Sequence, residues 1–130
     1  MFDCLDIETV IGFDWDDGNI YKNEKKHNLK WQTIEEIFFN DPLLIFEDDK
    51  HSNDECRCYA LGKTDELFYL FVAFTKRKNK IRVISARLMN QKEREYYENY
   101  TNFWNRTTRK RILGKQWFYR IYWLEKCKKY

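Results

Sequence analysis

Residues 67–74, LFYLFVAF, form an apolar run without a charged residue, and this run constrains the fold more than any other feature of the chain. It is far too short for a membrane-spanning helix, which needs roughly 20 apolar residues. A strand whose side chains are apolar on both of its faces must be covered on both faces. The sequence therefore predicts a central β-strand inside a sheet.

Strand-like patterns continue on either side of this run, from residue 43 onward. The predicted strands are 43–48 (LLIFED), 56–62 (CRCYALG), 66–77 (ELFYLFVAFTKR) and 80–87 (KIRVISAR). Short connections such as GKTD and KRKN favour antiparallel hairpins over crossover connections. We expect one four-stranded antiparallel sheet.

Two helices are predicted before the sheet. Residues 18–30 are polar and follow Asp16 and Asp17, either of which is a good N-cap. The second helix is indicated by Thr33 with Glu36 three residues later, the pattern of a capping box. These two helices are expected to pack against the sheet that follows them.

A third helix is predicted after the last strand. Asn90 offers an N-cap with Glu93 three residues on, and Tyr96, Tyr100 and Phe103 recur at helical spacing. The complete pattern is α+β, with two N-terminal helices, a four-stranded antiparallel sheet and a C-terminal helix.

The size of the chain suits one hydrophobic core, because it has 130 residues of which 43% are hydrophobic. No window approaches a membrane span, and the first ten residues, MFDCLDIETV, lack the features of a signal peptide. A cytoplasmic protein is expected. The close cysteine pair, Cys56 and Cys58, has no second pair at metal-ligand spacing, which favours structural, reduced cysteines.

Charge is distributed unevenly, with a net charge of −10 for residues 1–66 and +13 for residues 76–130. The basic half fits phosphate binding and the acidic half a basic protein partner, although two differently charged solvated surfaces explain the pattern equally well. The segment 101–130 carries nine Lys or Arg and one acidic residue. We therefore expect a domain at 1–104 and a basic aromatic extension at 105–130, whose composition suits base stacking, an anionic surface or coverage of the core.

Three stretches carry a resemblance to a known family, namely 13–31, 38–64 and 74–99. Within them a set of residues falls in the order and spacing of the BrnT family of bacterial toxins, the RelE-like ribonucleases of type II toxin–antitoxin modules. These residues are Asn23, Lys26-His27, Asp41-Pro42, His51-Ser52, Glu55-x-Arg57, Gly62 and Ile84-Ser85-Ala86-Arg87. Asn28 stands where such toxins usually have glycine, and the chain after residue 100 has no counterpart in the family pattern.

The resemblance implies a RelE-like fold and an endoribonuclease that arrests growth by cutting RNA. It also implies a BrnA-like ribbon-helix-helix antitoxin, with operator DNA bound only through the complex of toxin and antitoxin. We expect no cofactor, no metal and no membrane partner. The rival interpretation is a catalytically inactive domain of the same fold that acts as a corepressor with the antitoxin.

RNA can be cut by its own 2′-hydroxyl when a protein supplies a proton acceptor, cations for the phosphorane and a proton donor. Arg77, Arg82 and Arg87 lie on or beside the last two predicted strands, where a buried unpaired guanidinium would be costly. Paired guanidinium donors match two phosphate oxygens, so we expect these arginines to meet RNA phosphate. An ideal strand would place Arg82 and Arg87 on opposite faces, and Arg87 has the alternative of an ion pair with Glu93.

Three residues are candidates for proton transfer. His27 follows Lys25 and Lys26, whose charges favour a neutral imidazole suited to be a base, although the alternative is a surface residue that closes a helix. His51 lies in the acidic loop EDDKHSND, which favours the protonated form. Glu55 is the third candidate, unless it simply pairs with Arg57 on the same strand face.

The catalytic candidates from the sequence are thus Arg82, Arg87, His27, His51 and Glu55. The candidates for RNA contacts are Lys26, Arg57, Arg77 and Lys80. A zinc site built from the histidines and cysteines is disfavoured, because no two of them have paired ligand spacing.

Overall fold

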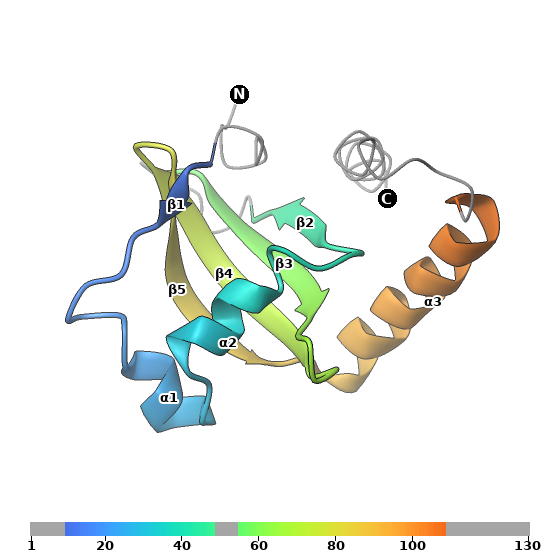
Figure 1. The fold of residues 1–130 in the computed structure, drawn as a ribbon, viewed down its shortest axis with the longest axis horizontal. Helices are drawn as coiled ribbons and strands as arrows, with labels where there is room; N and C mark the ends of the chain where they lie inside the picture. The colour runs from blue at the N-terminus through green and yellow to red at the C-terminus, as the bar shows by residue number, and fades with distance from the viewer. Residues whose placement is uncertain (1–9, 49–54, 109–130) are drawn as a thin grey trace.

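The computed structural model describes residues 10–48 and 55–108, with side chains up to residue 102. In this part of the chain, a mixed sheet carries α2 on one face and α3 on the other, with α1 beside strand β5 (Figure 1). The elements in chain order are β1 (Gly12–Phe13), α1 (Lys22–His27), α2 (Trp31–Glu36), β2 (Leu44–Glu47), β3 (Arg57–Lys63), β4 (Tyr69–Arg77), β5 (Lys80–Leu88) and α3 (Gln91–Thr108). The predicted α+β class is confirmed.

The strand order in the described sheet is β1-β5-β4-β3-β2. The four predicted strands are present as antiparallel neighbours, and β4 is central as expected. The expected number of strands was wrong, because β1 adds a fifth strand that pairs parallel with β5 at Lys80 and Ile81. Two residues are too few to produce a period-two pattern that sequence analysis could detect.

Strand β4 is covered on both faces, as predicted, but it begins at Tyr69, and the first two residues of the apolar run, Leu67 and Phe68, precede it and are 64% and 50% exposed. Leu70 and Phe74 are fully buried on the face that α2 covers, which we call the inner face. There the ring of Phe38, just after α2, meets Phe74 edge to face at a centroid distance of 5.5 Å. Phe71 points to the opposite face, which we call the open face, and packs against the core cluster that contains Tyr97 of α3.

The first helix is shorter than predicted, spanning Lys22–His27 within the expected 18–30. Asp16 does accept hydrogen bonds from the backbone N–H groups of Gly18 at 2.8 Å and Asn19 at 3.1 Å. These bonds fix the turn that precedes the helix and leave the helix itself without a side-chain cap.

The predicted capping box of the second helix was also wrong. Helix α2 begins at Trp31, so Thr33 lies inside it and cannot cap it. Glu36 is used elsewhere, because its carboxylate accepts a hydrogen bond of 3.0 Å from the backbone N–H of Asp65. This contact ties the end of α2 to the turn between β3 and β4.

The capping box of the third helix is confirmed. The Asn90 side chain accepts from the backbone N–H of Glu93 at 2.8 Å, and Glu93 accepts in return from the backbone N–H of Asn90 at 2.9 Å. Tyr97 and Tyr100 form the buried stripe, whereas Tyr96 is 44% exposed, so the predicted stripe was shifted by one residue at its start.

Helix α3 continues to Thr108, past the predicted domain boundary at 104. Most of the predicted extension, residues 109–130, and the side chain of Phe103 lie outside the described part, so the domain division stays a prediction. Among the helices that the structure describes, none is long and apolar enough to cross a membrane.

Beyond β1, side chains from the α1 region cover the outer edge of β5. The side chains involved belong to Asn19, Lys22 and the buried Asn23. Their respective partners on the β5 backbone are the carbonyls of Val83 (3.2 Å) and Ile84 (3.0 Å) and the N–H of Ala86 (2.9 Å). An edge strand covered in this way is protected from pairing with another chain.

Candidate nucleic-acid interface

A β-bulge in β5 places Arg82 and Arg87 on the same face of the sheet. The register between β4 and β5 shifts by one, which leaves Ile84 as an extra residue in β5. An extra residue reverses the alternation of the side chains that follow it. The expectation of opposite faces was therefore wrong: Arg82 lies across from Thr75 and Arg87 across from Phe71, both on the open face.

Basic side chains gather where β3 and β5 begin and β4 ends. Arg57, Thr75 and Arg82 are neighbours across β3, β4 and β5 on the open face. Arg77 and Lys80 pair with each other at the next position of the same face. We call these four basic residues, Arg57, Arg77, Lys80 and Arg82, together with Glu55, which contacts Arg77, the basic end of the open face.

Arg82 is held by two carboxylates from the segment that follows β1. Its Nη2 lies 2.8 Å from Oδ2 of Asp16, and its Nη1 lies 3.6 Å from Oδ2 of Asp14. The hydrogen bond from Arg82 lowers the pKa of Asp16 below its ordinary value. The Arg82 side chain is only 22% exposed, so these carboxylates provide the anion that a partly buried arginine requires.

Arg77 makes a bidentate ion pair with Glu55. The distances are 2.7 Å from Nε to Oε2 and 2.6 Å from Nη2 to Oε1. This pairing lowers the pKa of Glu55 and raises the pKa of Arg77. The alternative of a Glu55–Arg57 pair was wrong, since both carboxylate oxygens of Glu55 accept from Arg77. Arg57 has its Nε 3.7 Å from Oδ2 of Asp48.

Arg87 pairs with Glu93, as the sequence alternative suggested. Its Nη1 and Nη2 donate to the two carboxylate oxygens at 2.9 and 3.0 Å, and its Cζ lies 4.1 Å from the ring centroid of Phe71. Burial opposes ionisation of Glu93, but the hydrogen bonds from Arg87 and from the Asn90 backbone outweigh it and lower the pKa. Glu93 thus couples the start of α3 to an arginine of the open face.

Replacing Glu93 by glutamine should lower the free energy of unfolding at neutral pH. It should also reduce the loss of stability that wild type shows as the pH falls below 4.5. A carboxylate with a lowered pKa stabilises the folded state above its unfolded value, here 4.5, and loses this contribution as the pH falls through the folded value. Glutamine can still accept from the Asn90 backbone, but its amide nitrogen cannot accept from Arg87, so the change removes the charge together with one hydrogen bond. Urea unfolding at pH 7 and at several pH values below 4.5 measures the difference.

Glu98→Gln is the matched control, because Glu98 makes an exposed ion pair with Arg94 one helical turn away on the same helix, at 3.5 Å. Parallel pH profiles for wild type and Glu93→Gln would contradict the role given to this carboxylate.

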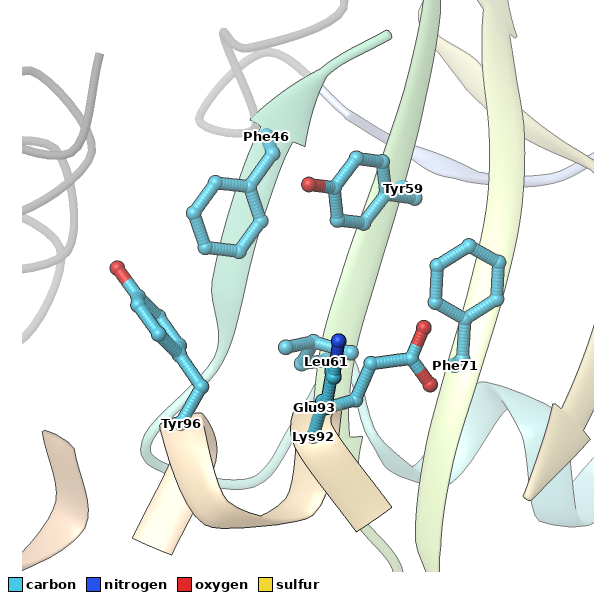
Figure 2. A pocket seen from close by; sticks show the side chains of 7 residues that line it. All are labelled: Phe46, Tyr59, Leu61, Phe71, Lys92, Glu93 and Tyr96. Atoms are coloured by element: carbon cyan, nitrogen blue, oxygen red, sulfur yellow. The ribbon is translucent and has the colours of Figure 1, made fainter. Parts of the chain in front are cut away.

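Three aromatic rings form a row across the open face (Figure 2). The row lies beside the basic end, since Tyr59 and Arg57 are two residues apart on β3. Phe46 stacks on Tyr59 at 5.0 Å, and Tyr59 stacks on Phe71 at 5.2 Å, with interplanar angles of 22° and 23°. Arg87 covers the Phe71 end of this aromatic row, and Tyr96 of α3 meets the Phe46 end edge to face at 5.8 Å. The row was not predicted, although Arg57 and Tyr59, two residues apart on one predicted strand, share a face of it.

The family of the chain follows from a comparison with family models. Residues 15–93 match the family described as "Ribonuclease toxin, BrnT, of type II toxin-antitoxin system". The chain belongs to this BrnT family. The matched segment includes strands β2 to β5, so it contains the whole basic end and Arg87.

A solved structure, the ribonuclease toxin BrnT of Brucella abortus, is similar at 22% sequence identity and a TM-score of 0.48. The match covers 63% of this chain and 100% of that one. No curated protein matches the chain. Membership of a type II toxin family brings two partners with it, an RNA substrate and an antitoxin.

The other residues predicted for this BrnT-family chain lie apart from the basic end or outside the described part. Lys26 and His27 are exposed in the last turn of α1. Within the described residues, we find no hydrogen bond or ion pair between His27 and the arginines of the open face. His51 lies at 49–54, outside the described residues. The structure therefore brings together Arg57, Arg77, Lys80, Arg82 and Glu55, with Arg87 further along the same face.

The two close cysteines belong to the inner face. Cys58 is fully buried in the core and Cys56 packs against it, with their Sγ atoms 3.9 Å apart. This placement fits the structural role expected for them. In the described ranges, no group of three or more His, Cys, Asp or Glu side chains is arranged to hold a metal ion.

Proposed function

We propose that this chain is a metal-independent endoribonuclease that inhibits translation and growth, and that its open face binds the RNA. The observation that carries the proposal is the bulge in β5, which aligns Arg82 and Arg87 on one accessible face within a segment that matches a ribonuclease toxin family. The neutralising partner is a BrnA-like ribbon-helix-helix antitoxin in the cytoplasm, and operator DNA is bound only through the complex.

In this proposal, the 2′-hydroxyl of RNA attacks the adjacent phosphorus and expels the 5′-oxygen. Arg82 and Arg87 stabilise the negative charge that develops on the phosphorane, because guanidinium donors match two of its oxygens. RNA must displace the carboxylates that now occupy these arginines. When a phosphate takes Arg77 from Glu55, the pKa of Glu55 rises toward its ordinary value, which makes Glu55 a better proton acceptor.

His27 and His51 remain the other candidates for proton transfer. Of these, His27 is solvent-exposed at the end of α1, so it would reach the RNA only from the side of β5 that α1 lines. Lys26, Arg57, Arg77 and Lys80 are proposed to hold flanking phosphates. Each contact of this kind should contribute to the salt dependence of RNA binding.

Cleavage of a model RNA should survive EDTA and leave a 2′,3′-cyclic phosphate or a 3′-phosphate. The reason is that the cations in the proposed mechanism are arginines and the nucleophile belongs to the RNA. Mass spectrometry of the products, with and without EDTA, measures both properties. Strict dependence on a divalent ion, or products with a 3′-hydroxyl, would refute the transesterification mechanism.

Expression of the chain alone should arrest growth, and co-expression of a cognate ribbon-helix-helix antitoxin should restore it. Pulse labelling of protein synthesis would show whether translation stops before growth does.

The ion pairs at Arg82, Arg77 and Arg87 also suit an inactive corepressor, since paired arginines often serve as scaffold. A chain that binds the antitoxin and promotes operator binding, without any effect on growth or RNA, would establish that rival function.

A further inference from the structure

A pocket lies between helix α3 and the aromatic row of the open face (Figure 2). Its volume is about 420 Å³, within the range of pockets that bind small ligands. It is lined by Phe46, Tyr59, Leu61, Phe71, Lys92, Glu93 and Tyr96. Lys92 and Glu93 of α3 place charged groups at one wall, while the strands supply the aromatic walls.

The aromatic side chains of this pocket are ordered by contacts with one another. The aromatic row fixes Tyr59 between Phe46 and Phe71, and Tyr96 is placed by its contact with Phe46. Even so, Tyr96 is 44% exposed, so part of its ring is open to a ligand. A rigid group of aromatic rings with solvent access is the type of surface on which nucleobases stack.

The pocket is also within reach of the arginines of the same face. Tyr59 and Arg57 are two residues apart on β3, which corresponds to about 7 Å along a strand. Arg87 lies against Phe71 at the other end of the aromatic row. Phosphate-binding groups therefore border the aromatic surface on two sides, which is the charge arrangement that a single-stranded polyanion with planar bases requires.

We propose that this pocket binds one nucleobase of the RNA, next to the phosphate that the arginines hold. The inference rests on the proposed ribonuclease function and gives it a substrate subsite. The base stacks on the exposed part of Tyr96 and contacts the aromatic row, while the Lys92 ammonium donates to a carbonyl or ring nitrogen of the base. An apolar side chain of a protein partner is the competing occupant, and the experiment separates the two.

The first experiment measures binding of short, fully 2′-O-methylated oligonucleotides, which cannot be cleaved by their own 2′-hydroxyl. Tyr96→Ala should weaken their binding about 5- to 100-fold, the effect of losing one aromatic platform for a base. Tyr96→Phe should bind like wild type. Tyr21→Ala is the matched control, because Tyr21 is 55% exposed and does not line the pocket.

The loss in Tyr96→Ala should be the same at every salt concentration. Stacking releases no counterions, so the slope of log affinity against log salt should stay at the wild-type value. Lys80→Ala provides the contrast, since loss of one phosphate contact should flatten that slope by about 0.7. A flatter slope in Tyr96→Ala would mean that the tyrosine acts by placing phosphate contacts, and it would overturn the subsite.

The second experiment places a single abasic residue at each position of the oligonucleotide in turn. At one position the abasic change and Tyr96→Ala should not add, because both remove the same stacking contact. Full additivity at every position, or no binding of the oligonucleotides by wild type, would overturn the inference. Loss of antitoxin binding by Tyr96→Ala with unchanged RNA binding would also overturn it, since the pocket would then bind a protein.

The same measurements distinguish the subsite from the proposed function. Suppose that wild type binds the probes and that Tyr96→Ala and one abasic change do not add, yet wild type leaves the unmodified RNA uncut. This result would refute the nuclease and support the base-binding pocket.

Discussion

Arg82→Ala should lower the rate of RNA cleavage by about 100- to 1000-fold, the range for removing one donor that stabilises the transition state. Toxicity should be relieved with it. Arg82 is the member of the basic end that two carboxylates, Asp14 and Asp16, hold at a fixed position on the open face. Asp14 and Asp16 are partly exposed, at 38% and 49%, so water can solvate them without Arg82, and circular dichroism and the melting temperature should stay close to wild type.

Arg94→Ala is the matched control for this change. Arg94 also makes an ion pair and lies over a ring, with Glu98 at 3.5 Å and the Tyr69 centroid at 4.5 Å, but it belongs to α3. Arg82→Lys should recover part of the activity, since it keeps the charge without the paired donors. Full cleavage by Arg82→Ala, or loss of the fold together with activity, would exclude a direct role for Arg82 in the chemistry.

Phe74→Ala should destabilise the protein by about 3–5 kcal/mol, the usual cost of truncating a buried phenylalanine. Phe74 has no exposed surface, lies on the central strand and meets the ring of Phe38. Because small domains are stable by only about 5–15 kcal/mol, a large part of the folded margin would be lost. Urea unfolding monitored by circular dichroism gives the change directly.

Phe39→Ala is the control for the loss of a phenylalanine as such. Phe39 is 74% exposed, and its ring lies 6.2 Å from the ring of Phe13, which is itself only partly buried. It should change the free energy of unfolding by less than about 1 kcal/mol. Equal losses for Phe74→Ala and Phe39→Ala would mean that the inner face is not the main source of stability.

The parts of the fold that sequence analysis predicted correctly are those with strong local patterns. The apolar run at 67–74 gave the central strand because burial on both faces leaves no polar position in the pattern. The box at Asn90 and Glu93 gave the start of α3 because both partners of the reciprocal cap are in the sequence.

The same capping pattern failed at Thr33 and Glu36, since a tertiary contact competed for one of its members. The Glu36 carboxylate accepts from the backbone of Asp65, 29 residues away, and the helix starts earlier, at Trp31. Strand β1 was missed for a related reason. Its pairing with β5 depends on the position of a distant strand, and two residues carry no pattern of their own.

For the candidate site, residue types were predictable and their arrangement was not. Arg77, Arg82 and Arg87 were identified from charge within apolar strands, and the Arg87–Glu93 pair followed from its spacing. The partners of Arg82 could not be foreseen, because Asp14 and Asp16 reach it only through the pairing of β1. The catalytic and RNA-binding roles of these residues stay predictions.

The extra residue at Ile84 makes the arrangement of the two arginines depend on the bulge. If β5 straightened without losing a residue, the spacing of five between Arg82 and Arg87 would turn Arg87 toward the inner face, away from Phe71 and Glu93. If the bulge were lost together with one residue, the two arginines would be four positions apart, and both would stay on the open face. During evolution, the bulge and the extra residue should therefore be gained or lost together, and a search for distant relatives should allow a spacing of either four or five between the two arginines.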